Sequence, residues 1–191
     1  MISIKQKILK YLIENKEKTF SINEISKALK IDYKLVHTNV NKLLEDESIK
    51  VEEFGNTRRC SFDNAFNEDV YIAETQRREN ILKNKDLLVI YNHIKELNRQ
   101  FILLLFGSQA KGTANKHSDI DLLIVSDEEV AKEVDQKLRL LSYNIHATPV
   151  TYESFIRMAK SKEFTVVSEA IKKNIILVGI EDYYRLLKNA R

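Results

Sequence analysis

One short stretch in the middle of the chain constrains its fold more than any other. Residues 101–106 form an apolar run that leads into Gly107-Ser108, and Asp119-x-Asp121 opens a second apolar run. This order predicts a strand, a Gly-Ser turn, a short helix and a second strand. Because alternate side chains of a strand share one face, Asp119 and Asp121 are expected to point the same way.

The two aspartates predict a bound cation. Carboxylates side by side repel each other unless a cation lies between them. Mg²⁺, or Mn²⁺ in its place, prefers oxygen ligands and keeps coordination positions open for substrate phosphates. Gly107 lets the backbone approach a phosphate closely, and Ser108 places a hydroxyl at a predicted helix N-terminus, where anions are favoured. The pattern therefore indicates a site for a metal with ATP or another nucleoside triphosphate.

The complete motif resembles the nucleotidyltransferase superfamily of DNA polymerase β, and most closely its small prokaryotic members, the minimal nucleotidyltransferases. The residues that carry the resemblance are Gly107, Ser108, Ala110, Lys111, Gly112, Ser118, Asp119, Asp121 and Leu122. The resemblance implies a polymerase β-like α/β nucleotidyltransferase domain with a small mixed sheet over residues 99–191. It also implies that Asp119 and Asp121 are metal ligands and catalytic residues, and that Gly107, Ser108 and Lys111 bind the nucleotide.

The first third of the chain predicts three helices and a hairpin. Apolar residues recur at helical spacing from residue 3 to 15, Ser21 and Glu24 form a capping-box pattern, and Asp32 is a third helix cap. Two short β-like runs then flank Gly55-Asn56-Thr57. The order resembles a winged helix-turn-helix domain over residues 1–66, so the expected fold class is α+β and mostly helical.

A winged helix places its third helix in the DNA major groove and its wing on the backbone. The residues expected to contact DNA are Lys34, His37, Thr38, Asn41, Arg58 and Arg59. Acidic residues at 45–47 and 52–53 would repel DNA if they faced it. Contact with another protein therefore remains the alternative function of this domain.

Residues 67–98 predict a helical connector, either one helix or two helices broken near 83–85. Its first half either links the domains or pairs with a second copy, which would give a homodimer.

Composition limits the compartment and the partners. The 191 residues carry 31 Lys+Arg and 28 Asp+Glu, and the resulting net charge of +3 is too small to argue for nucleic acid by itself. The single cysteine, Cys60, excludes an internal disulfide and fits a reducing cytoplasm. No apolar run approaches the roughly 20 residues that span a bilayer. We therefore expect a cytoplasmic protein without a membrane segment.

The predicted domain departs from the family at one position. The family's enzymes usually carry a third carboxylate on the strand after Asp-x-Asp, here within residues 143–150. The period of a strand places Asn144, His146 and Thr148 on the face towards the aspartates, and none is acidic. Three explanations stay open. His146 is the general base, Glu153 reaches in from the next helix, or the domain binds a nucleotide without transferring it.

Two functions from different classes follow. The first is a metal-dependent transferase that moves AMP from ATP to an acceptor hydroxyl, for which the resemblance suggests a HEPN-type protein partner. The second is a DNA-binding transcriptional regulator whose inactive nucleotidyltransferase domain senses a nucleotide. A bare interaction scaffold is disfavoured, because a scaffold gains nothing from two adjacent carboxylates.

Overall fold

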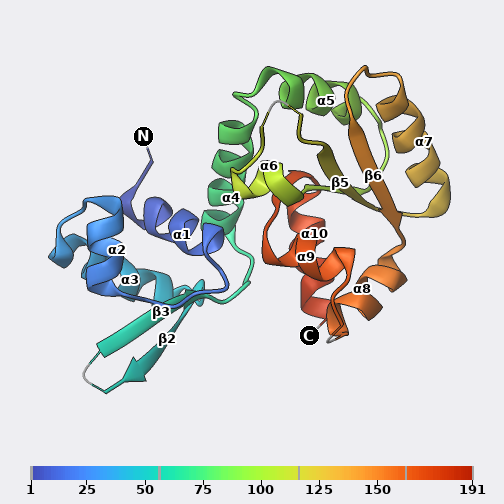
Figure 1. Ribbon diagram of the computed structural model, residues 1–191. Helices are drawn as coiled ribbons and strands as arrows, with labels where there is room; N and C mark the ends of the chain where they lie inside the picture. Colours follow the sequence, from blue (N-terminus) through green and yellow to red (C-terminus); the bar gives the residue numbers. More distant parts are fainter. Residues whose placement is uncertain (1, 56, 116, 162, 191) are drawn as a thin grey trace. The chain divides into compact units, whose positions relative to one another are not determined.

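The computed structural model describes residues 2–55, 57–115, 117–161 and 163–190 as an α+β protein (Figure 1). Its internal contacts divide the chain into two compact units, Met1–Thr75 and Gln76–Arg191. The division falls inside one helix, α4 (Glu68–Ile81). Over the described ranges, no helix has the length and apolar character needed to cross a membrane.

The first unit contains the helices and the hairpin expected from the sequence. Its elements are α1 (Ile4–Glu14), β1 (Phe20–Ser21), α2 (Ile22–Leu29), α3 (Tyr33–Glu45), β2 (Ile49–Phe54) and β3 (Thr57–Phe62). The three strands form an antiparallel sheet in the order β1-β3-β2. Asn56, predicted in the hairpin turn, lies outside the described residues.

Local capping explains where these helices begin. The Ser21 hydroxyl accepts from the Glu24 backbone N–H, and the Glu24 carboxylate accepts from the Ser21 backbone N–H at 2.6 Å. Asp32 accepts from the first turn of α3. The helices bury their apolar stripes in a core that includes Leu9, Leu12, Val36, Val40 and Leu43.

The second unit is built on a four-stranded sheet. After α4 come α5 (Lys85–Lys95), β4 (Ile102–Leu105), α6 (Gly107–Lys111), β5 (Ile120–Val125), α7 (Glu128–Arg139), β6 (Ile145–Val150), α8 (Tyr152–Lys160), α9 (Val166–Lys172), β7 (Ile175–Val178) and α10 (Ile180–Asn189). The sheet order is β6-β5-β4-β7. Strands β5 and β6 are parallel and the other neighbours are antiparallel, so the sheet is mixed.

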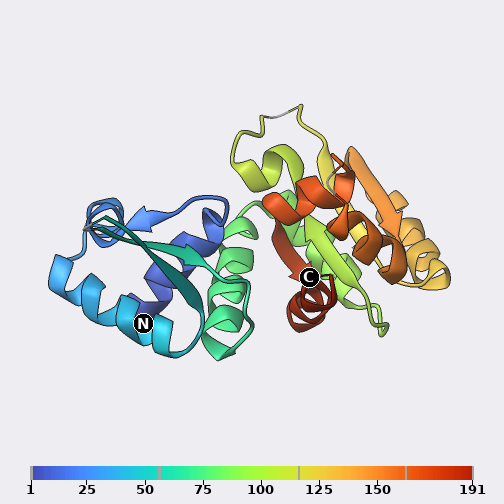
Figure 2. The same cartoon turned by 90° about the horizontal axis from the view of Figure 1, so that it is seen from below.

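Helices cover both faces of this sheet (Figures 1 and 2). On one face Leu103, Leu122 and Ile124 pack with the buried stripes of α5 and α7. On the other face α10 packs against β4 and β7 and contacts α8, which in turn contacts α9. Strands β4, β5 and β7 are therefore almost entirely buried, whereas the edge strand β6 keeps exposed residues.

The predicted connector consists of two helices, α4 and α5, with the break at residues 82–84. Asn84 accepts from the first turn of α5. The end of α4 is bound to the second unit, because Arg77 donates to the Asn174 carbonyl at 2.5 Å and Arg78 donates to the Leu177 carbonyl at 3.2 Å. The predicted boundaries at residues 66 and 98 remain predictions.

Candidate functional site

The two predicted aspartates lie where β5 begins. Asp119 precedes the strand and is exposed, whereas Asp121 is its second residue and is half-buried. The side-chain amide of Asn144 donates a hydrogen bond to Asp119 Oδ1. The parallel register places Asp121 directly beside His146 on β6. The two carboxylates therefore lie at the start of β5, next to the residues that begin the neighbouring strand β6.

Gly107 is shaped to receive Asp121. Its φ of 63° lies in the left-handed region, which glycine adopts without steric cost. A Cβ added at this position would stand 2.0 Å from Asp121 Oδ2, well inside van der Waals contact. The Phe106 N–H also donates to the Asp121 carbonyl at 3.0 Å. The Gly-Ser turn and Asp121 are therefore packed directly against each other. Ser108 follows Gly107 in α6 and is half-buried.

The strand that should carry a third carboxylate has the faces expected from its period. Ile145 and Ala147 pack against the core beneath α7, and His146 lies on the opposite face beside Asp121. His146 Nδ1 is 3.7 Å from Asp121 Oδ1, and the His146 side chain is 73% exposed. Glu153 lies exposed in the first turn of α8.

Sequence reasoning missed Glu169, an acidic residue that helix α9 brings to the site. Its Oε1 lies 2.8 Å from Lys111 Nζ, at the end of α6. Glu169 is also close enough to Asp121 to raise the pKa of that carboxyl. Local sequence holds no signal for this contact, because it depends on where the fold places α9 relative to α6.

Burial raises the pKa of Asp121, and the charges of Asp119 and Glu169 push this pKa in the same direction. His146 opposes the shift. A divalent cation at Asp119 and Asp121 would relieve this repulsion, so the oxygen donor set fits one such ion. Within the described part of the chain, no three His, Cys, Asp or Glu side chains cluster closely enough to hold a metal. Phosphate and water oxygens would have to complete the coordination.

The residues predicted to contact DNA lie on α3 and β3 of the first unit. Lys34 and Thr38 are exposed, and His37 and Asn41 are half-buried. Arg58 donates to Asn41 Oδ1 at 3.4 Å, which links the hairpin to α3.

Arg59 is held differently from its neighbour Arg58. Its guanidinium donates to the Thr19 hydroxyl and to the Thr19 carbonyl, both at 2.8 Å, and lies 3.6 Å from Glu24. Arg59 therefore connects β3 to the start of α2, and two of its nitrogens, Nε and Nη2, already donate within the unit.

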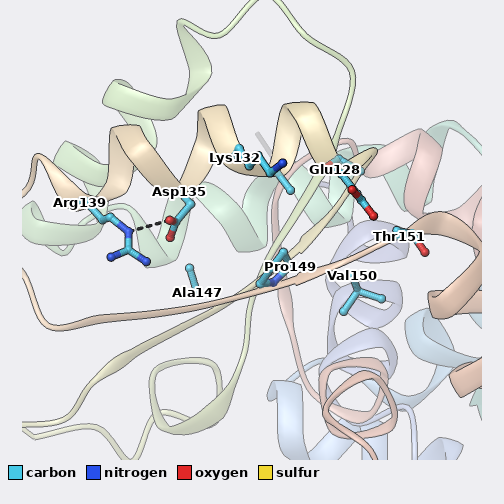
Figure 3. Close-up of a pocket in the computed structure, with 10 residues that line it drawn as sticks. Glu128, Lys132, Asp135, Arg139, Ala147, Pro149, Val150 and Thr151 are labelled. Carbon is cyan, nitrogen blue, oxygen red and sulfur yellow. Dashed lines mark hydrogen bonds and ion pairs between the residues drawn. The ribbon is translucent and has the colours of Figure 1, made fainter.

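A separate pocket of about 420 Å³ lies between α7 and β6 (Figure 3). It is lined by Ser126, Glu128, Ala131, Lys132, Asp135, Arg139, Ala147, Pro149, Val150 and Thr151. Ala147 belongs to the face of β6 opposite His146, so this pocket is distinct from the carboxylate site.

The mixed sheet and the paired aspartates fit a nucleotidyltransferase domain. Residues 90–178, which contain the whole carboxylate site, match the family described as nucleotidyltransferase domain. A probable protein adenylyltransferase, MntA of Haemophilus influenzae (strain ATCC 51907 / DSM 11121 / KW20 / Rd), is 36% identical over 47 residues. That match covers 25% of this chain and 41% of the relative's length. Together the two matches support the nucleotidyltransferase superfamily for this part of the chain.

A solved structure also shows a limited likeness. It is Sso10a-2, a DNA-binding protein from Sulfolobus solfataricus, with 16% identity and a TM-score of 0.31. The alignment covers 50% of this chain and 96% of that chain. A TM-score this low does not indicate a shared fold.

Proposed function

We propose that this protein is a metal-dependent nucleotidyltransferase that moves AMP from ATP to an acceptor hydroxyl. The packing of Asp121 against Gly107, with Asp119 beside it, is the observation that carries this proposal. In the reaction the acceptor oxygen bonds to the α-phosphorus, the bond to the β-phosphate oxygen breaks, and pyrophosphate leaves. The name of the Haemophilus influenzae relative suggests a protein as the acceptor.

Each site residue has a distinct role in this proposal. Asp119 and Asp121 would hold Mg²⁺ or Mn²⁺, which when bound neutralises phosphate charge. Asn144 fixes the Asp119 carboxylate by its hydrogen bond. Lys111 and Ser108 bind the phosphates that leave, and the Gly107 backbone lies closest to them.

His146 is the proposed general base. It takes the position beside Asp121 where the family usually has its third carboxylate. A neutral imidazole can accept the proton of a hydroxyl group within hydrogen-bond reach. The exposure of the His146 side chain leaves its ring accessible to an acceptor hydroxyl.

The first test is transfer of label from α-labelled ATP in host lysate, with Mg²⁺ or Mn²⁺. Asp119→Asn and Asp121→Asn should each lower transfer by about a hundredfold or more, because each removes a charge that stabilises the bound cation. Asp127→Asn is the matched control. Asp127 is an exposed aspartate at the start of α7 that makes no capping hydrogen bond, so its loss should leave transfer unchanged.

A second function fits the same chain if the wild type binds ATP with metal but transfers no label. We propose in that case a DNA-binding regulator that responds to the nucleotide, with the first unit as a winged helix. The observation in its favour is the order of three helices and a hairpin, with Arg58 on the hairpin beside α3.

Two arginine variants test the regulator. Arg58→Ala should weaken DNA binding and its salt dependence, since Arg58 retains free donors for phosphate. Arg59→Ala should instead lower the stability of the first unit, because Arg59 donates to Thr19. DNA affinity that is the same with and without ATP and Mg²⁺ would contradict nucleotide sensing.

A further inference from the structure

The outer side of α7 carries a regular stripe of charges. Glu128, Lys132, Asp135 and Arg139 follow one another at spacings that keep them on one face of a helix, and their signs alternate. All four side chains line the pocket between α7 and β6 (Figure 3). The buried stripe of α7 (Ala131, Val134 and Leu138) is a different face. The charges therefore border an open groove and have no role in the core.

The floor of this groove is the free edge of the sheet. Strand β6 is the last strand in the order and pairs only with β5 among the described strands. Ile120 N–H donates to the Asn144 carbonyl, and Ser126 N–H donates to the Val150 carbonyl. Even-numbered residues of β6 thus bond to β5, and the backbone groups of Ile145 and Ala147 point outward.

The edge is also limited. Pro149 lies at the next outward position and has no N–H to donate, so a long strand cannot add here with a complete ladder. The groove offers apolar contact from Ala147, Pro149 and Val150, between the short open edge and the charged stripe. A partner must match the charges as well as the edge.

The charge order of the stripe is complementary to itself when a second α7 is placed against it in the opposite direction. Glu128 then lies opposite Arg139 of the second copy, and Lys132 lies opposite its Asp135. Each pair occurs twice about a two-fold axis, which is the condition for a closed interface between identical chains. We propose that the α7–β6 groove binds the same groove of a second copy of this chain.

The dimensions of the elements suit this pairing. Helix α7 packs beside β6 and connects parallel strands, so it runs opposite to β6. Strands that pair edge to edge lie about 4.8 Å apart, and helices that pack together lie about 8–10 Å apart. Two copies of β6 that meet antiparallel near Ala147 therefore bring their α7 helices side by side, with the stripes facing each other.

The charges set the register of this dimer more than its strength. Exposed ion pairs contribute little each, and salt screens them. Asp135 already pairs with Arg139 on its own helix at 2.6 Å, so the dimer extends an existing ion pair into a network. The affinity is expected to be micromolar and to fall as salt rises.

The test is sedimentation equilibrium of the full chain with charge reversals on the stripe. Lys132→Glu places Glu opposite Asp135, and Asp135→Lys places Lys opposite Lys132, so each variant alone should dimerise at least tenfold more weakly than wild type. An equal mixture of the two variants restores both attractive pairs and should form heterodimers. Arg185→Glu is the control, because it breaks an exposed ion pair on α10 of the same kind.

Three results would overturn the proposal. One is a wild-type chain that stays monomeric at about 100 μM in low salt, well above the expected dissociation constant. Another is a dimer that both reversals leave unchanged, which would place the interface elsewhere, for example on the connector. The third is a mixture that stays monomeric. None of these results depends on whether the protein transfers a nucleotide.

Discussion

Gly107 and Gly112 share a left-handed backbone but differ in what surrounds them. Gly107 has a φ of 63° and Gly112 has a φ of 72°. A side chain at Gly107 would collide with Asp121, whereas nothing lies within 4 Å of a Cβ at Gly112. A comparison of alanine variants at the two glycines therefore distinguishes the effect of backbone strain from the effect of displacing Asp121.

Gly107→Ala should abolish metal-dependent ATP binding, because Asp121 must leave its position. Gly112→Ala should lower the free energy of unfolding by about 1 kcal/mol through left-handed strain and should retain ATP binding. Urea titration and ATP binding with Mg²⁺ measure both effects. Wild-type ATP affinity in Gly107→Ala would show that the contact with Asp121 is not needed.

For single residues, the sequence predicted the contacts within one short motif and missed a contact between residues far apart in the chain. The glycine and the two aspartates belong to one short motif, and the strand period assigned His146 to the correct face. The contact of Glu169 with Lys111 joins two helices that are far apart in sequence. No spacing rule predicts such a contact, since it depends on where the fold places α9 relative to α6.

The capping interaction at the start of α2 makes the stability of the fold depend on pH. The pKa of Glu24 is lowered from 4.5, mainly by the hydrogen bond from the Ser21 backbone N–H. A carboxylate whose folded pKa is lowered stabilises the fold above its unfolded pKa, and this contribution is lost as pH falls through the folded value. The stabilisation by Glu24 is therefore complete above about pH 4.5 and declines below it.

Glu24→Gln keeps a side-chain acceptor for the cap but removes the charge. The wild type should be the more stable protein at pH 7, and the difference should shrink towards pH 3. Urea unfolding at several pH values measures this, with Glu47→Gln, at an exposed position after α3, as the control. A difference that is constant with pH would argue against the charged cap.

The start of a helix could be predicted from the sequence where its capping residue lies within a few positions of the first turn. The predicted caps at Ser21 and Asp32 are both present, because a cap and its helix are adjacent in sequence. The sequence left open whether residues 67–98 form one helix or two. Helix α4 carries charges around most of its surface and has no clear apolar stripe, so its packing could not be predicted.

For the molecule as a whole, the two units should unfold as separate cooperative steps. Leu12 and Leu122 are fully buried, the first in the N-terminal unit and the second in the C-terminal one. Truncation of either to alanine should cost about 2–5 kcal/mol. Leu12→Ala should move only the transition of the first unit, and Leu122→Ala only that of the second.

The thiol of Cys60 is a probe for the unfolding of the first unit. It is fully buried on β3, and burial raises the pKa of its thiol, although Arg58 opposes this shift. A thiol reagent should therefore label Cys60 only when the first unit opens. Equal labelling in Leu12→Ala and Leu122→Ala at the same urea concentration would mean that the two units unfold together.

Helix α4 affects how readily a protease can cut the chain between its two units. The junction of two units is often an extended linker, and such linkers are where limited digestion cuts first. Here the junction at residues 75–76 lies within a run of helical backbone hydrogen bonds. A protease can bind this backbone only after the helix melts locally, so the two units are expected to remain on one polypeptide through mild digestion.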